Sequence, residues 1–334
     1  MGFWAFVGLL LVNWWTALAF AGALGFRFWY RRNIGFCTCQ NRLDGRTALI
    51  TGANTGIGLE TAKDLARRGA RVLLACRDPQ KGQKALELVR AEASKGAAVK
   101  LLPLDLESLA SVRACAATVL STEPRLDILV NNAGAGYLGN RQTEDGLHLG
   151  LQVNHFGPLL LTLLLADLLE KSSPSRIVFV SSIMHEIATL RAEMLDYDRA
   201  KRIPELQIYA ISKLANILVA NELSRRLRSA GVTVNSLHPG AVRTEIFRYS
   251  PYGIDQLIPF IFGIFGKTPL EGAQTSIHLV VSEKVAGVTG RYFRDCKEAP
   301  MARTAEDYEL SKAVYKKSIE LLNLNERECP SFLR

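Results

Sequence analysis

The sequence lacks the patterns that mark several protein classes. None of its six cysteines, at positions 37, 39, 76, 115, 296 and 329, forms a C-x-x-C pair or a cysteine–histidine cluster with zinc spacing. We therefore expect no metal site and no disulfide framework, but reduced thiols in a domain that faces the cytosol. No stretch repeats at a period of about 20 to 50 residues. No Pro/Gly/Ser-rich linker divides the chain, so one large domain is expected.

Basic residues are in excess but are not concentrated. The 334 residues carry a net charge of +9, and the small clusters, such as Arg225, Arg226 and Arg228, are scattered. No basic stripe with interleaved aromatic residues appears, so no nucleic-acid partner is expected. Attraction to an anionic membrane surface fits this charge better.

The longest uncharged stretch, Gly2–Phe26, lies at the N-terminus and exceeds the ~20 residues that a helix needs to cross a bilayer core. Arg27, Arg31 and Arg32 follow, so the positive-inside rule leaves the downstream domain in the cytosol. A cleaved signal peptide is the alternative, but its basic start and shorter apolar core are missing. The predicted organisation is a membrane anchor over 1–30, a juxtamembrane linker over 31–44, the main domain over 45–322 and a tail over 323–334. Cys37 and Cys39, just past the anchor, are either spectator thiols or acylated.

A glycine-rich turn follows the first apolar strand. The run 47–51 predicts a strand, Gly52, Gly56 and Gly58 follow as G-x-x-x-G-x-G, and a helix then ends at Gly69. The run 71–76 predicts a second strand. Strand, glycine turn, helix and strand is the context of a dinucleotide site, in which the backbone approaches a pyrophosphate at the helix N-terminus. A purely structural turn is the alternative.

The end of the second strand predicts the cofactor. An acidic residue there would hold the ribose hydroxyls of NAD. Here the strand ends at Cys76 and Arg77, and a guanidinium suits a 2′-phosphate, so we predict NADP(H). Asp78 is a confounder, and a solvated Arg77 is the alternative.

Later apolar runs also end in polar residues, where ligands bind in open α/β sheets. These residues are Asp105, Asn131, Asn132, Ser181, Ser182 and the pair Pro239 and Gly240. Continuous apolar runs are typical of parallel strands buried on both faces. The predicted fold class is α/β, a single-domain doubly wound parallel sheet (Rossmann-like) with an N-terminal transmembrane helix.

The stretch YAISK, Tyr209 to Lys213, lies in a predicted amphipathic helix. Residues i and i+4 share a helix face, so the phenol and the ammonium are neighbours. We expect the ammonium to lower the phenol pKa from about 10, which suits a general acid or base. Taken alone, the motif favours an amphipathic tyrosine beside a solvated lysine, so the rest of the chain must decide between the two interpretations.

Together these motifs resemble the short-chain dehydrogenase/reductase family, over roughly Gly45 to Gly290. The motifs are TGANTGIG, Asp105, NNAG, the asparagine of QVNHFG, a strand-end serine, YAISK and HPGAVRT. The resemblance implies a doubly wound sheet, usually of seven strands, and a catalytic tetrad of Asn154, Ser182, Tyr209 and Lys213. Ser181 is the neighbour that can be confused with Ser182.

The resemblance also implies roles. Ser182 hydrogen-bonds the substrate oxygen, Tyr209 passes the proton, Lys213 holds the nicotinamide ribose, and Asn154 supports a water-linked proton path. Thr244 contacts the nicotinamide amide. The implied cofactor-binding residues are Gly52, Asn54, Thr55, Gly56, Ile57, Gly58, Arg77, Asp105, Asn132, Ala133, Gly134, Tyr209, Lys213, Pro239, Gly240, Val242 and Thr244.

The branch that the chain looks like is that of the membrane-anchored retinol dehydrogenases. LLACRD, EGAQTS, GRYFRDC and a long insertion between Ser182 and Tyr209 carry this likeness. It implies an NADP(H)-dependent oxidoreductase in the endoplasmic reticulum membrane, facing the cytosol, that interconverts a lipophilic alcohol and its aldehyde or ketone, retinol and retinal first. Alternatives are a steroid or other lipid carbonyl reductase and a catalytically idle, cofactor-binding membrane scaffold.

Two apolar stretches have competing interpretations. Residues 157–169 predict a buried core helix or a homodimer interface, being too short to cross a membrane. Residues 253–267 fall where the family places its substrate loop. Their apolar centre, Ile258–Phe265, is either a core helix or a lid that dips into the bilayer surface.

Overall fold

A computed structural model describes residues 3–242 and 266–324, and divides the chain into two compact units, Met1–Gly35 and Phe36–Arg334. The first unit holds one helix, α1 (Phe3–Arg32), with Arg31 and Arg32 in its last turn. Among the described residues, no helix combines the length and the apolar character that crossing a membrane requires. The transmembrane helix expected over Gly2–Phe26 is therefore not confirmed.

The second unit is built on one sheet with the strand order β3-β2-β1-β4-β5-β6-β7-β8. Strands β1 to β7 are parallel, and only β8 runs antiparallel, beside β7. The strands are β1 (Thr47–Thr51), β2 (Arg71–Cys76), β3 (Val99–Pro103), β4 (Ile128–Asn131), β5 (Ser175–Val180), β6 (Val232–His238), β7 (Tyr292–Arg294) and β8 (Lys297–Glu298). The predicted doubly wound parallel sheet is confirmed. The short β8 adds an eighth strand to the seven that the family resemblance implied.

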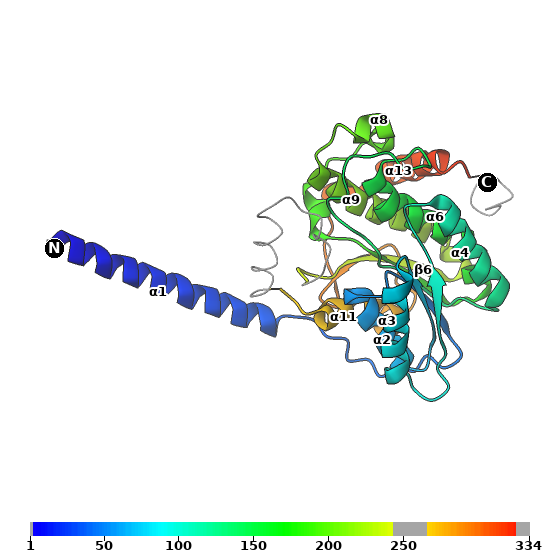
Figure 1. The fold of residues 1–334 in the computed structure, drawn as a ribbon, viewed down its shortest axis with the longest axis horizontal. Coiled ribbons are helices and arrows are strands. Elements are labelled where there is room, and N and C mark those ends of the chain that lie inside the picture. The colour runs from blue at the N-terminus through cyan, green and yellow to red at the C-terminus, as the bar shows by residue number, and fades with distance from the viewer. Residues whose placement is uncertain (1–2, 243–265, 325–334) are drawn as a thin grey trace. The chain divides into compact units, whose positions relative to one another are not determined.

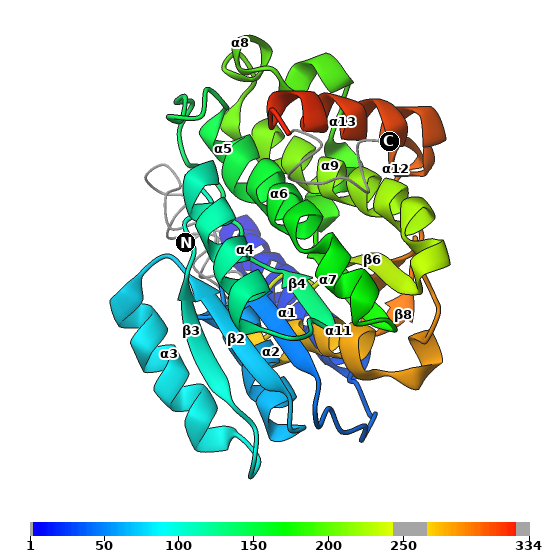
Figure 2. The ribbon, with the colours of Figure 1, turned by 90° about the vertical axis from the view of Figure 1, so that its right-hand side faces the viewer.

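Helices cover both faces of this sheet (Figures 1 and 2). One face carries α2 (Gly56–Arg67), α3 (Pro79–Glu92) and α11 (Pro269–Val281). The other carries α4 (Leu109–Thr122), α6 (Gly157–Leu164) and α9 (Glu205–Arg226), and α13 (Tyr308–Leu321) packs on α9. The shorter helices are α5 (Leu149–Leu151), η1 (Gln152–Phe156), α7 (Ala166–Lys171), η2 (Ile183–Ile187), η3 (Ala192–Leu195), α8 (Tyr197–Ala200), η4 (Arg228–Ala230), η6 (Glu283–Val285) and α12 (Arg303–Glu306).

The central strands β1, β2 and β4 are mostly apolar because both of their faces are buried. Leu49 belongs to the core cluster under α4, α6 and α9, whereas Ile50 belongs to the cluster under α2, α3 and α11. Successive side chains of a strand point to opposite faces, so a run such as TALIT supplies both cores.

Local capping fixes where several of these helices begin. Asp78 caps α3, and its Oδ1 accepts the backbone N–H groups of Gln80 and Lys81 at 2.9 and 3.0 Å. Thr268 and Glu271 form a reciprocal capping box at the start of α11. Both caps lie directly beside segments that the site uses.

The apolar stretch 157–169 forms α6 and most of α7, separated at Leu165. Leu159, Leu160 and Leu161 are fully buried within the single chain. The core interpretation of this stretch fits, because these leucines are covered without a second copy.

The insertion between Ser182 and Tyr209 folds as η2, η3 and α8. It is held by the C-terminal elements, since Lys317 of α13 pairs with Asp196 at 2.8 Å and the Ala302 N–H donates to His185 Nε2 at 3.3 Å. The insertion is thus an ordered cover over the end of α9.

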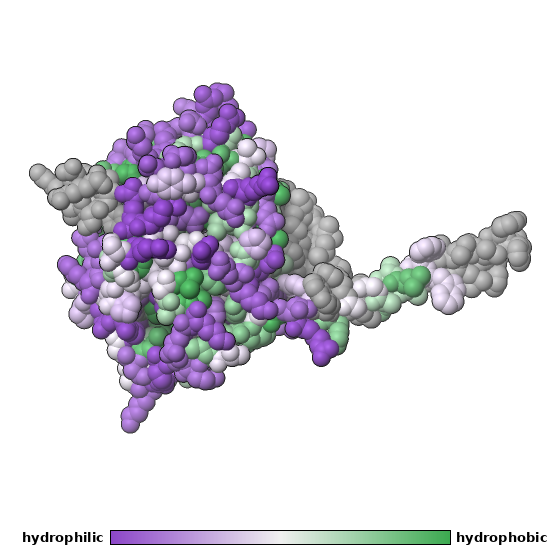
Figure 3. All heavy atoms as spheres, turned by 180° about the vertical axis from the view of Figure 1, so that it is seen from behind, coloured by the Kyte–Doolittle hydropathy of each residue, from purple (hydrophilic) through white to green (hydrophobic). Residues whose placement is uncertain are grey.

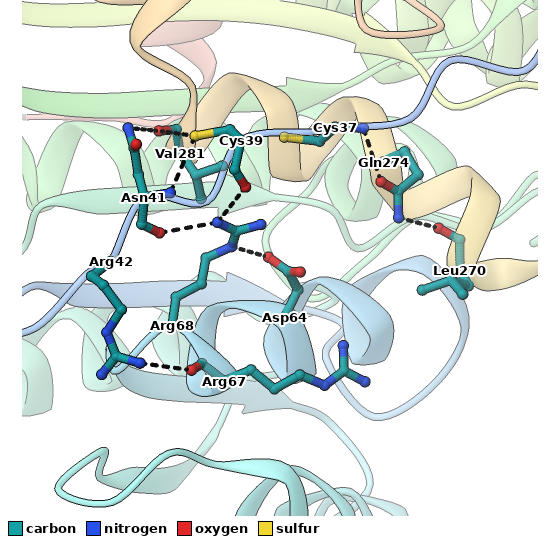
Figure 4. Close-up of polar contacts among 10 residues, drawn as sticks. All are labelled: Cys37, Cys39, Asn41, Arg42, Asp64, Arg67, Arg68, Leu270, Gln274 and Val281. Carbon is teal, nitrogen blue, oxygen red and sulfur yellow. Dashed lines mark hydrogen bonds and ion pairs between the residues drawn. The ribbon is translucent and has the colours of Figure 1, made fainter.

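Residues 36–43, which we call the strap, lie along α11. The backbone N–H of Cys37 donates to Gln274 Oε1 at 3.1 Å, and Asn41 Nδ2 donates to the carbonyl of Val281 at 3.0 Å (Figure 4). The Cys39 thiol contacts the same Val281 carbonyl at 3.5 Å. Exposure alternates along the strap, so its odd-numbered residues face the domain.

The strap also binds the C-terminal end of α2, where Arg68 makes two of the contacts and Arg42 Nη1 donates to the Arg67 carbonyl at 3.4 Å. Arg68 Nη1 donates to the backbone carbonyls of Cys39 and Asn41 at 2.8 and 3.0 Å, and Arg68 Nε donates to Asp64 at 2.6 Å (Figure 4). The predicted linker 31–44 is therefore docked on the domain from Phe36 onwards.

Candidate active site

A cleft of about 530 Å³ opens where the strand order reverses, at the carboxyl ends of β1, β2 and β4. Its volume lies in the range of about 300–1,000 Å³ that is usual for small-molecule sites. Ten of the predicted cofactor residues line it, namely Gly52, Asn54, Thr55, Gly56, Ile57, Arg77, Asp105, Asn132, Ala133 and Gly134.

The glycine turn leaves no room for side chains. Gly52 and Gly56 have φ values of +64° and +57°, in the left-handed region that favours glycine. A Cβ on Gly58 would lie 2.4 Å from the Gly52 carbonyl oxygen and 2.5 Å from Asn132 Nδ2. The backbone is thus bare at the N-terminus of α2, as a pyrophosphate requires.

The NNAG segment is fixed to β1. Thr51 Oγ1 accepts the N–H groups of Asn132 and Ala133 at 3.0 Å each, and Asn132 Nδ2 donates to the Thr51 carbonyl at 2.8 Å. Asn131 points the other way and donates to Thr162 on α6 at 2.8 Å. The floor of the cleft is therefore rigid.

Two cations, Arg77 and Lys81, and three acids, Asp78, Asp105 and Glu107, are among the residues that line the cleft. Arg77 is half exposed, with its Nη1 3.7 Å from Glu107 Oε2, and Lys81 lines the cleft beside it. Asp78 also lines the cleft, but its Oδ1 is already used to cap α3.

Eight further residues that line this cleft were not predicted from the sequence: Ala75, Lys81, Leu104, Leu106, Glu107, Ala135, Leu138 and Val153. A lysine one helical turn after Arg77 is a signal that could have identified Lys81. The bare glycine turn at this cleft fits a nicotinamide dinucleotide.

The segment after β6 lies against the glycine turn. Gly240 has a φ of +96°, and Lys267 Nζ donates to the Pro239 carbonyl at 3.1 Å. A Cβ added to Gly272 would lie 2.7 Å from Val242 and 3.2 Å from Ile57. Lys267 itself is buried and paired with Asp295 at 2.6 Å, a contact that sequence reasoning did not predict. Thr244 and the stretch Ile258–Phe265 lie outside the described residues.

The two adjacent serines at the end of β5 take different partners. The Ser182 hydroxyl hydrogen-bonds the Tyr209 phenol, whereas the Ser181 hydroxyl donates to the backbone carbonyl of Lys213 at 2.8 Å. The geometry points to Ser182 as the serine that faces the phenol, and Ser181 ties β5 to α9.

Lys213 lies within the site and is buried. Its Nζ donates to the Val180 carbonyl at 3.0 Å and lies 5.6 Å from the centre of the Tyr209 ring. A Cβ on Gly134 would lie 3.0 Å from Lys213 Nζ and 3.1 Å from Asn154 Oδ1. The glycine of NNAG therefore lets these two side chains approach the cleft wall.

Asn154 sits in η1, a π-helical turn, a conformation often found at functional sites. Its Oδ1 accepts the Ala135 N–H and its Nδ2 donates to the Ala135 carbonyl, both at 2.8 Å. Asn216 of α9 donates to the Asn154 carbonyl at 2.8 Å. Asn216 is a positioning residue that sequence reasoning missed.

Tyr209 and Asn154 line a small pocket of about 10 Å³. Ala135 and Leu138 line both this pocket and the larger cleft. The structure thus brings the whole predicted tetrad together at the inner end of the dinucleotide cleft.

The expected lowering of the tyrosine pKa is wrong for this structure. Burial raises the pKa of Tyr209 to about 12, against the opposing hydrogen bond from Ser182. Burial also lowers the pKa of Lys213 to about 8. The sequence placed the ammonium beside the phenol, but burial of both groups is a tertiary effect that the i, i+4 spacing does not contain. At pH 7 the site therefore holds a neutral phenol, ready to donate a proton, beside a lysine that is still mostly charged.

Comparison with known proteins agrees with this fold and site. The family profile described as short chain dehydrogenase matches residues 46–252. The chain belongs to the short-chain dehydrogenase family, and it is therefore an oxidoreductase by family.

Its curated relatives place it in the retinol dehydrogenase branch of that family. The chain is 42% identical over 323 residues to human (Homo sapiens) retinol dehydrogenase 14, covering 90% of this chain and 96% of the relative. It is 42% identical over 290 residues to human retinol dehydrogenase 12, covering 87% and 90%.

Solved structures share the fold. A putative uncharacterized protein from Mycobacterium paratuberculosis matches with a TM-score of 0.68 and 30% identity, covering 87% of this chain and 98% of that one. A structure titled Pseudomonas aeruginosa RhlG/NADP active-site complex matches with a TM-score of 0.59 and 26% identity, covering 75% and 95%.

Proposed function

We propose that the chain is an NADP(H)-dependent oxidoreductase that interconverts a lipophilic alcohol and its aldehyde or ketone, with retinol and retinal as the first candidates. The observation that carries this proposal is the Ser182–Tyr209 hydrogen bond beside Lys213, at the inner end of the dinucleotide cleft. The names of the retinol dehydrogenase relatives support the choice of substrate class.

The nicotinamide supplies the hydride in reduction and accepts it in oxidation. The chain's own residues handle the substrate oxygen and its proton. In reduction, Ser182 and Tyr209 hydrogen-bond the carbonyl oxygen, and Tyr209 donates its proton as negative charge develops there. The nearby Lys213 ammonium stabilises the phenolate that remains, and Asn154, held by Ala135, supports the path by which that phenolate is reprotonated.

Tyr209 is the group that exchanges a proton with the substrate oxygen. Burial raises its pKa to about 12, so at pH 7 the phenol is protonated, which is the form that donates to the oxygen as negative charge develops in reduction. Because cytosolic NADPH is kept mostly reduced, we propose carbonyl reduction as the main direction.

NADP(H) is proposed over NAD(H) from the two cations that line the cleft. Arg77 and Lys81 can both contact a 2′-phosphate there, and charge-assisted contacts to a phosphate are strong. Glu107 opposes this choice, but its carboxylate is already paired with Arg141 and Arg77. Use of the Asp78 carboxylate as a helix cap favours the same choice.

We also propose that the protein is a single-pass membrane protein, anchored over Gly2–Phe26 in the endoplasmic reticulum with its catalytic domain facing the cytosol. The uncharged stretch and the arginines that follow it support this proposal. A lipophilic substrate partitions into the same bilayer, since each buried methylene favours transfer by about 0.8 kcal/mol. A homodimer is compatible with these features, and no nucleic acid takes part.

The test is turnover of the full chain in non-ionic detergent with retinal, a steroid ketone and a medium-chain aldehyde, each with NADPH and with NADH. We expect retinal with NADPH to be the best pair. Tyr209→Phe keeps the ring but removes the transferable proton, so turnover should fall at least ~100-fold while NADPH still binds. Best turnover of the steroid ketone would assign the site to a steroid reductase.

A catalytically idle scaffold is the rival from another class. It predicts NADPH binding with no turnover of any substrate in the panel. The burial of the Lys213 ammonium beside the buried Tyr209 phenol argues against it, because burying a charged group is costly.

A further inference from the structure

A second cleft, of about 520 Å³, lies at the opposite edge of the sheet, at the amino ends of β4, β5 and β6. One wall is the strap with the residues that follow it, and another is the end of α11 with the turn after it. Neither the dinucleotide nor the proposed substrate uses this edge, since both bind at the carboxyl ends of the strands. The proposed function therefore assigns no role to this cleft.

The cleft is lined by more arginines than carboxylates. Four arginines line it, Arg42, Arg46, Arg176 and Arg228, against two aspartates, Asp44 and Asp127. Leu43, Val232 and Val280 are among its apolar lining residues. The lining thus combines a surplus of two positive charges with apolar area.

Both aspartates are already paired. Asp44 receives a bidentate contact from Arg42, at 2.7 and 2.9 Å. Asp127 Oδ1 accepts a hydrogen bond from Arg46 Nη1 at 2.5 Å, and its Oδ2 accepts one from the Thr47 N–H at 2.8 Å. Both carboxylate oxygens also accept hydrogen bonds from Arg125. Neither carboxylate has a contact with Arg176 or Arg228, so those two arginines supply the surplus charge.

Arg176 is half-buried and has no carboxylate partner among the described residues. Its Nη1 donates to the carbonyls of Leu279 and Ser282, at 2.9 and 3.0 Å, at the C-terminal end of α11. This contact is a structural role, since a cation stabilises a helix C-terminus. These two hydrogen bonds use only Nη1 of Arg176. Within the described part of the chain, the N–H groups of Nε and Nη2 donate no hydrogen bond to the protein.

Arg228 adds a second guanidinium to the same cleft. It lies in η4, directly before the turn at Gly231, where φ is +74°. Its side chain is exposed, and among the described residues it makes no hydrogen bond or ion pair. Arg228 differs from an ordinary solvated surface arginine because it lines the same cleft as the half-buried Arg176.

We propose that this second cleft binds a phosphate-bearing ligand, whose phosphate is held by Arg176 and Arg228 and whose carbon part lies against the apolar wall. A phosphate group carries about −1.5 to −2 charges near neutral pH, which matches the surplus of two. The guanidinium fork suits the oxygens of such a group. Arg176 lines the cleft, and of its N–H groups only those of Nη1 have acceptors in the described part of the chain. The ligand is either a free phosphate compound or the headgroup of an anionic lipid.

The test uses the full chain in non-ionic detergent, in an Arg77→Ala background that weakens phosphate binding in the cofactor cleft. Isothermal titration measures binding of inorganic phosphate and of dihexanoyl phosphatidic acid. Arg228→Glu should weaken binding of both at least tenfold. Arg303→Glu, which alters an exposed arginine of α12 away from this cleft, makes the same change of charge and should leave binding unchanged.

Two further variants separate the cleft from general electrostatics. Ala286→Trp fills the cleft at an exposed lining residue and keeps all four arginines, and it should also weaken binding at least tenfold. Arg176→Gln keeps a donor for the α11 carbonyls, and circular dichroism checks that it folds. Equal loss from Arg228→Glu and Arg303→Glu, or no loss from Arg228→Glu and Ala286→Trp, would overturn the proposal.

The two ligands distinguish the sources. If phosphatidic acid binds more tightly than inorganic phosphate, and if Arg228→Glu and Ala286→Trp weaken both, the ligand is a lipid headgroup. Equal binding of the two identifies a free phosphate compound. Phosphate binding that appears only when Arg77 is intact belongs to the cofactor cleft and counts against a second site.

Discussion

Lys213 is the residue whose charge sets the upper pH limit of the proposed reduction. Its pKa is lowered to about 8 by burial, so its protonated fraction falls from about nine-tenths at pH 7 to about one-tenth at pH 9. Tyr209, with a pKa of about 12, stays protonated over the same range. Between pH 7 and pH 9 we therefore expect deprotonation of Lys213, and not of Tyr209, to lower the activity.

We expect kcat/KM for reduction to fall about tenfold between pH 7 and pH 9. Lys213→Arg stays charged throughout, so it should be slower overall but flat over this window. Steady-state kinetics at a series of pH values measures both profiles. A flat wild-type profile would mean that the charge of Lys213 plays no part in the chemistry.

Arg77 is the residue at which cofactor choice can be measured. Arg77→Ala should raise the KM for NADPH about ten- to a hundredfold and hardly change that for NADH, because a charge-assisted contact to a phosphate is worth roughly 1.5–3 kcal/mol. Arg141→Ala is the matched control, since Arg141 shares the Glu107 carboxylate but does not line the cleft. Equal losses with both cofactors from Arg77→Ala would assign this arginine to the fold.

Among the elements, the strap meets the end of α2, where the Arg68 side chain makes two of the contacts. The Leu43 N–H and the Arg42 side chain add contacts with the backbone carbonyls of Arg68 and Arg67. Arg68→Met keeps the aliphatic stem but removes the donors to Cys39 and Asn41. We expect it to lower the free energy of unfolding by about 1–3 kcal/mol and to expose residues 36–43 to limited proteolysis.

Arg67→Met is the control for the strap, one position earlier on the same helix. Arg67 pairs with Glu92 on the surface, and exposed pairs contribute about 0–1 kcal/mol. Cleavage that increases equally in both variants would show that Arg68 does not hold the strap.

Sequence reasoning found the elements that depend on neighbours along the chain. The glycine turn at Gly52–Gly58 and the apolar runs of β1, β2, β4, β5 and β6 are local patterns, and the structure places them as expected. The strap was missed because its hydrogen-bond partners on α11 lie 237 to 242 positions away. The fold of the insertion and the raised pKa of Tyr209 were missed for the same reason, since both depend on packing between distant segments.

At the scale of the whole molecule, all five histidines have a lowered pKa. Burial is the largest cause for each, with values of about 4 for His155 and about 3 for His238. A lowered pKa means that the unfolded chain binds more protons than the folded one below pH 6.5. This contribution to stability is fully present above pH 6.5 and is lost as the pH falls towards the folded pKa values.

We therefore expect the free energy of unfolding to fall between pH 6.5 and pH 5, by about 2 kcal/mol from His155 alone. Thermal unfolding at a series of pH values measures the slope. His155→Gln, which cannot titrate, should be less stable at pH 7 because its contacts with Asn216 and Ser318 change, but it should have a shallower slope. An unchanged slope in this variant would rule out His155 as a source of the acid sensitivity.

The strap also sets an order of events on the ribosome. Cys37 is synthesised 237 residues before Gln274, its partner on α11. At roughly 5–20 residues per second, the nascent strap waits about 10 to 50 s for that partner. During this interval the sulfur atoms of Cys37 and Cys39 are accessible to modifying enzymes and reagents, and docking on α11 then partly covers them. Modification of these two cysteines is therefore easier before docking than after it.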